Sequence, residues 1–186
     1  MSKTLEMMAR PIPESAKLPL VSLLDESRLL TEVQSRIADR DISAHSCRIG
    51  HIRYLPDSTC TVRFTVSCSG PGEIDRHDVG MYARCLDSRH FTKMVGVLTA
   101  RKWISGELAA APYSVSTLQS IFYEFPNDGQ LPQLDQLDDL SALHALIGRP
   151  FKDRCDSDGS PLTVQHLQYK PESRLISRLH TRASRD

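Results

Sequence analysis

Two arginines stand at the same place in two similar stretches of the chain, and their side chains suit the binding of phosphate or carboxylate groups. The first stretch, "HIRYLPDSTCTVRFTV", begins at His51 and contains Arg63. The second, "HLQYKPESRLISRLHT", begins at His166 and contains Arg178. A planar guanidinium can donate two parallel hydrogen bonds to such a group. The alternative is a solvated strand face with ion pairs across neighbouring strands, and we favour this interpretation.

The similarity of the two stretches goes beyond the arginines and predicts a strand, a tight turn and a strand in each. The other shared positions are Tyr54 and Tyr169, Pro56 and Pro171, and Ser58 and Ser173. Proline restricts φ to values that suit a turn, and serine can hydrogen-bond to the nearby backbone. An isolated hairpin is marginal in water, so the second copy is expected to pack on another part of the protein.

Other residue patterns give no support for a metal site or a hydrolytic site. The segment "DRCDSDGS" at residues 153–160 has Arg154 where a calcium loop needs an acid, so a polar turn is expected. No H-E-x-x-H motif and no glycine-rich phosphate loop occurs. Cys85 and His90 are too close in sequence to predict a nucleophile and its base without geometry. We predict no catalytic and no metal-binding residue.

Charge and composition limit the partners of the protein. The 186 residues carry 23 basic and 23 acidic side chains, whereas a surface that binds nucleic acid usually gives a basic excess. No apolar run approaches the roughly 18 residues that span a bilayer, and the N-terminal residues lack the apolar stretch of a signal peptide. We expect a cytoplasmic protein that contacts neither nucleic acid nor membrane. The five cysteines form no C-x-x-C pair, and Cys60 is expected to be a small buried residue.

The periodicity of the apolar residues predicts an α+β fold, with an antiparallel sheet and flanking helices. Helices are expected at residues 22–39, 88–104 and 137–148, and strands at 48–55, 59–68, 79–87 and 116–126. Val62, Phe64 and Val66 alternate with polar residues, which predicts one buried and one solvated face for that strand. The expected organisation is an extended arm at 1–20, a domain at 21–150, and a linker with the second hairpin at 151–186.

The strings "YLPDSTCTVRF", "VGMYARCLD" and "IFYEFPNDGQLPQL" occur in this order. Together they resemble the N-terminal lobe of the aminoglycoside phosphotransferase-like family, which has the kinase-like fold. The resemblance covers roughly residues 48–140 and rests on element order and short degenerate strings. It implies ATP with magnesium as the cofactor. It also implies a parent protein that phosphorylates a small hydroxylated molecule.

The resemblance also implies roles for particular residues. In the family a hairpin covers the phosphates, the next strand ends in a lysine that grips them, and a later strand enters a hinge that holds the adenine. In this sequence Ser58 and Thr59 fall in the hairpin turn, and Arg84 takes the place of the lysine. Glu124 and Phe125 fall at the hinge.

The second hairpin leaves two interpretations open. The chain is either the front part of a longer kinase-like protein, or a small protein whose last hairpin pairs with the first sheet. In the first case Ser173 and Arg174 would contact the phosphates in the second hairpin.

The sequence departs from the family pattern at the positions that do chemistry. Arg84 is larger and flatter than lysine, and residues 88–106 contain no Asp or Glu to pair with it. No loop of the form H-G-D-x-x-x-x-N occurs, although phosphoryl transfer needs such acidic and amide groups. We therefore predict a lobe that is inactive alone. The alternative is a non-catalytic adaptor that binds a protein through a sheet edge or the region of Trp103.

Overall fold

The computed structural model describes residues 18–55, 58–72, 75–131, 134 and 162–181. The chain divides into two compact units, Met1–Phe125 and Pro126–Asp186, and each is described by itself. The expected helix at 137–148, the linker from 151 and most of the expected N-terminal arm lie outside the described residues.

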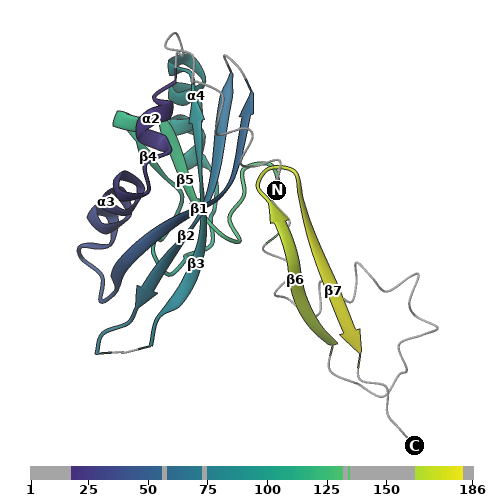
Figure 1. Ribbon diagram of the computed structural model, residues 1–186. Coiled ribbons are helices and arrows are strands. Elements are labelled where there is room, and N and C mark those ends of the chain that lie inside the picture. The colour runs from purple at the N-terminus through teal and green to yellow at the C-terminus, as the bar shows by residue number, and fades with distance from the viewer. Residues whose placement is uncertain (1–17, 56–57, 73–74, 132–133, 135–161, 182–186) are drawn as a thin grey trace, which may run out of the picture. The chain divides into compact units, whose positions relative to one another are not determined.

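The first unit is an α+β fold built on one antiparallel sheet of five strands, as the sequence predicts. Its helices are α2 (Leu20–Leu23), α3 (Glu26–Ile37) and α4 (Ser88–Ala100). Its strands are β1 (Ser43–Leu55), β2 (Thr59–Ser69), β3 (His77–Leu86), β4 (Tyr113–Val115) and β5 (Ser120–Glu124). The strands lie in the order β1-β2-β3-β5-β4, and α4 follows β3 and precedes β4 and β5, of which β5 pairs with β3 (Figure 1).

The ends of the helices differ from the expected ranges for local reasons. The predicted helix at 22–39 is interrupted, because Asp25 caps α3 by accepting hydrogen bonds from the backbone amides of Ser27 and Arg28. Helix α4 ends at Ala100 instead of reaching residue 104. The indole of Trp103 donates to the carbonyl of Leu98 at 2.9 Å, which satisfies a carbonyl that the end of the helix leaves without a partner.

One face of the sheet forms the core with α3. Leu29 and Val33 from α3 are fully buried, as are Val62 and Phe64 from β2. The predicted inward direction of these strand residues is confirmed. Cys60, at 1% exposure, is confirmed as a small buried residue.

The other face of the sheet is less solvated than the alternation in β2 predicts. Thr61 is buried, and on the neighbouring strands Tyr82 and Tyr123 are fully buried. Their rings stack with centroids 4.6 Å apart and planes 6° from parallel. The prediction of a solvated face is therefore wrong at this part of β2, because large side chains of β3 and β5 share that face.

The second unit contains a hairpin of β6 (Leu162–Lys170) and β7 (Arg174–Thr181), so both similar stretches form antiparallel hairpins (Figure 1). Leu55 pairs with Thr59 in the first, and Lys170 pairs with Arg174 at the matching place in the second. The next two pairs also match. The registers diverge beyond them, where each hairpin has an irregularity at a different position. The two hairpins therefore share the pairing of the residues next to their turns. The internal repeat itself stays a prediction.

Candidate phosphate-contacting face

Arg84 lies on β3 at the centre of the sheet, and the register places the predicted phosphate contacts around it. Thr61 of β2 is directly opposite Arg84 on one side, and Ile121 of β5 is opposite on the other. Opposite residues of an antiparallel pair share a face. Arg84 therefore lies on the face of the sheet that carries Tyr82 and Tyr123, away from the core with α3.

Thr59 joins Arg84 on this face, and Ser58 precedes it in the turn. Thr59 begins β2 and pairs with Leu86, so it is the diagonal neighbour of Arg84, at a typical distance of about 7–8 Å. The amide of Ser58 donates to the carbonyl of Leu55 at 3.2 Å, which closes the turn. Ser58 is exposed and Thr59 is half-buried. Thr59, the turn at Ser58 and Arg84 thus lie toward the same end of β2 and β3, and a hydroxyl, backbone amides and a guanidinium are groups that suit a phosphate.

Glu124 and Phe125 lie farther along the sheet than these residues. Glu124 pairs with Met81, three residues along β3 from Arg84, which corresponds to about 10 Å. The amide of Phe125 donates to the carbonyl of Gly80 at 3.0 Å. Because side chains alternate along a strand, Glu124 points to the face opposite that of Ile121 and Tyr123. Only its backbone remains for the hinge role that the resemblance implies.

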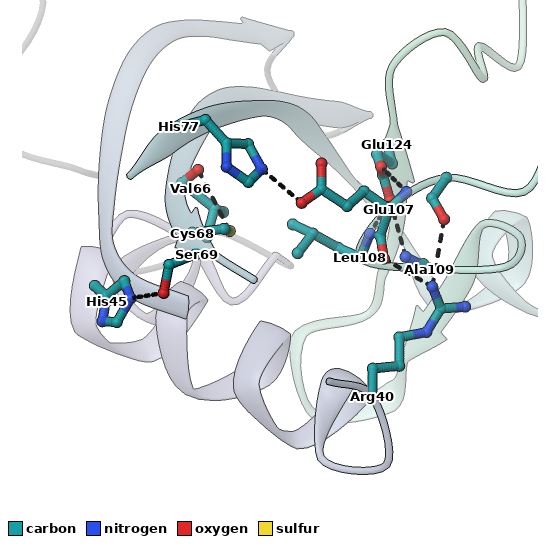
Figure 2. A network of polar contacts seen from close by, with 11 residues as sticks. Arg40, His45, Val66, Cys68, Ser69, His77, Glu107, Leu108, Ala109 and Glu124 are labelled. Carbon is teal, nitrogen blue, oxygen red and sulfur yellow. Dashed lines mark hydrogen bonds and ion pairs between the residues drawn. The ribbon is translucent and has the colours of Figure 1, made fainter. Parts of the chain in front are cut away.

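The side chain of Glu124 has a structural function of its own (Figure 2). It accepts hydrogen bonds from three consecutive backbone amides, those of Glu107, Leu108 and Ala109. Burial raises the pKa of the Glu124 carboxyl, and the three amides act in the opposite direction. The carboxylate therefore holds the loop between α4 and β4 against the end of β5.

Two further side chains, those of Arg40 and His77, form hydrogen bonds with the same loop (Figure 2). Arg40 donates to the carbonyls of Gly106 and Glu107 at 3.3 and 2.7 Å. His77 contacts the carboxylate of Glu107 at 2.5 Å. The loop thus joins the end of α3, the start of β3 and the end of β5.

Aromatic side chains extend the face of Arg84 toward the end of α4. Trp103 meets Tyr123 edge to face at 6.0 Å between ring centroids. The guanidinium of Arg101 lies 4.3 Å from the centroid of the Trp103 ring, within the range of a cation–π contact.

Ser173 and Arg174 lie in the second unit, at the turn of its hairpin, and both are exposed. The turn is anchored by Asp128, which is buried. One carboxylate oxygen of Asp128 accepts from the hydroxyl of Tyr169 at 2.5 Å and the amide of Glu172 at 2.8 Å. The other accepts from two amides of its own segment, those of Gln130 and Leu131. The structure places these residues within their own unit only.

The residues described here offer no group of three or more His, Cys, Asp or Glu side chains that could hold a metal ion. In the same described part of the chain, no helix is long and apolar enough to cross a membrane.

Sequence reasoning named Glu124 only as a hinge residue, and it missed the structural roles of the Glu124 and Asp128 carboxylates. Glu124 stands inside the apolar run "SIFYEF", and Asp128 stands in the turn sequence "NDG". An acidic residue within a buried strand is costly unless it is hydrogen-bonded, and this signal in the sequence was enough to indicate a structural role for Glu124.

Comparison of the chain with models of protein families finds no match. Searches of curated proteins and of solved structures also find no match.

Proposed function

We propose that the first unit is a kinase-like N-terminal lobe, related to aminoglycoside-type phosphotransferases, that holds the phosphates of ATP with magnesium and does not transfer phosphate alone. The observation that carries the proposal is the position of Arg84. It lies at the centre of the sheet, directly opposite Thr61 and diagonal to Thr59, beside the turn of the first hairpin.

The arrangement of the elements supports the same proposal. Three antiparallel strands are followed by a helix and by a strand that returns beside the third, as in the family that the sequence resembles. The carboxylate that pairs with the lysine in that family has no counterpart in α4, because residues 88–106 lack Asp and Glu. The proposal is therefore a lobe that binds nucleotide and depends on a second lobe for catalysis.

Thermal unfolding of the whole chain, with and without millimolar magnesium-ATP, tests the proposal. Ligand at about 100 times its Kd adds roughly 2.7 kcal/mol to the free energy of unfolding. We expect ATP to raise the Tm of the parent protein. In Arg84→Ala, the Tm with ATP should equal the Tm of the same variant without ATP. Arg84→Lys keeps the charge and should keep part of the increase.

Two control variants make this result specific. Arg48→Ala removes an exposed arginine from β1, at a position opposite Thr65, four residues along β2 from the partner of Arg84, and should leave the response to ATP unchanged. The double variant Ser173→Ala, Arg174→Ala should also respond, if the first hairpin is the site. A response that survives in Arg84→Ala, or one that is absent from the parent, would contradict the proposal.

The second candidate function is a non-catalytic adaptor, and the long edge strand β1 favours it. β1 spans 13 residues, and among the described strands only β2 pairs with it. An exposed strand edge can accept an extended peptide of a partner as a further strand. An adaptor of this kind would not respond to ATP in any of the variants above, so the same experiment separates the two candidates.

A further inference from the structure

Helix α4 differs from the other long helix of the first unit, because none of its residues is buried. Its apolar residues Phe91, Met94, Val95 and Leu98 are only half-buried, and they face one way. The opposite side carries Arg89, Lys93 and Val97, spaced four residues apart, and each of them is exposed.

Two further exposed residues, Lys102 and Ile104, follow shortly after the end of the helix. We call Arg89, Lys93, Val97, Lys102 and Ile104 the α4 outer face. Val97 is 42% exposed and Ile104 is 36% exposed, so this set of residues combines three cations with two large apolar side chains.

The charges of the α4 outer face are not balanced locally. Residues 88–106 contain no acidic residue, and within the described part of the chain none of the three cations forms an ion pair. Asp87, at the start of the helix, is already engaged by the backbone amide and ring of His90. Arg89 and Lys93 are like charges four residues apart, and Arg89 lies in the first turn, at the positive end of the helix dipole; both features destabilise a helix.

The chemistry of the face selects the kind of partner. Two cations on one helix turn, with Lys102 beyond, are complemented by carboxylates at helical spacing. Val97 and Ile104 are complemented by an apolar stripe beside those carboxylates. Only these two large apolar side chains are exposed here, too little apolar surface for a helix that inserts into a membrane interface.

We infer that the α4 outer face is a docking surface for an acidic amphipathic helix of a partner protein. This inference deepens the adaptor alternative, whose second expected contact is the region of Trp103, and it is independent of Arg84 and of the edge of β1. Docking neutralises the repulsion between Arg89 and Lys93 and covers Val97.

Fluorescence anisotropy with a labelled synthetic peptide tests the inference on the whole chain. The peptide is a short amphipathic helix with a leucine stripe flanked by glutamates. We expect binding that weakens as salt increases. We expect the double variant Arg89→Gln, Lys93→Gln to bind about tenfold more weakly, which corresponds to the loss of two partly desolvated charge pairs. Val97→Ser should weaken binding of the peptide at both low and high salt, because the contact that Val97 makes is apolar and is not screened by salt.

Matched controls separate docking from general attraction between opposite charges. The double variant Arg53→Gln, Arg76→Gln removes the same charge from exposed positions outside the face and should bind as the parent does. NMR shift changes on binding should concentrate in residues 88–106. Equal loss in the two double variants, or no binding of the peptide, would overturn the inference. Binding to phosphatidylserine vesicles in place of the peptide would overturn it in favour of a membrane surface.

Discussion

Replacing Gly106 by alanine is expected to lower the free energy of unfolding of the first unit by about 3 kcal/mol, because it expels a buried carboxylate from its donors. A Cβ at this position would lie 2.3 Å from the carboxylate carbon of Glu124 and 2.3 and 2.5 Å from its oxygens. A long side chain can usually move away from such a clash. Here the carboxylate is fixed by three backbone amides, and Glu124 is only 4% exposed.

A double-mutant cycle gives this prediction its test. Glu124→Ala should destabilise by a similar amount, since it leaves the same three amides without an acceptor. Adding Gly106→Ala to Glu124→Ala should cost almost nothing further, because the atoms that the new methyl group would meet are gone. Urea unfolding followed by the fluorescence of Trp103, the only tryptophan, reports on the first unit. Additive losses in the cycle would contradict the prediction.

Gly96 provides the control for the glycine substitution. It lies inside α4, is exposed, and an added Cβ meets nothing within 4 Å. Gly96→Ala should therefore raise the free energy of unfolding by about 0.5–1 kcal/mol, since alanine favours a helix more than glycine does.

Replacing Asp128 by alanine is expected to unfold the hairpin of the second unit. Asp128 accepts four hydrogen bonds, and two of them come from Tyr169 and Glu172 at the hairpin turn. Hydrogen bonds to a charged acceptor contribute about 1.5–3 kcal/mol each, and an isolated two-stranded hairpin is marginal without support. Hydrogen exchange should show amides of β6 and β7 losing most of their protection in Asp128→Ala.

Graded variants make this second prediction specific to the contacts of Asp128. Tyr169→Phe removes one hydrogen bond and should have a smaller effect. Asp128→Asn keeps one oxygen, but its amide group faces the amide of Glu172, so its effect should be intermediate. Ser173→Ala, at an exposed position in the same turn, should change nothing. Protection of β6 and β7 that is unchanged in Asp128→Ala would show that the hairpin is held by other contacts.

The sequence predicts the parts of this fold that depend on short-range patterns. The alternation of Val62, Phe64 and Val66 identifies β2 and its core face, because a strand repeats every two residues. The break between α2 and α3 is missed, because Leu23 and Leu24 continue the apolar pattern through a position where Asp25 caps a new helix.

The candidate site is predictable only in part, for a physical reason. The sequence gives Arg84 and Thr59 as candidates, and the strand register brings them to one face. The contacts of Glu124, and those that Asp128 makes with the second hairpin, come from segments that are distant in sequence. Asp128 and Glu172 are 44 residues apart, and no local pattern encodes their approach.

The buried thiols of the sheet make it possible to measure, by thiol labelling, how often its strands separate. Burial raises the pKa of Cys60 to about 12 and that of Cys68 to about 11. At neutral pH these sulfurs are protonated, and only the thiolate attacks a labelling reagent. Once the strands separate, the thiols regain an ordinary pKa and react with the reagent. In a variant with Cys155 replaced by serine, the labelling rate therefore reports how often the sheet opens. Cys60 and Cys85 face each other across β2 and β3, and a label on either one blocks the strands from closing again.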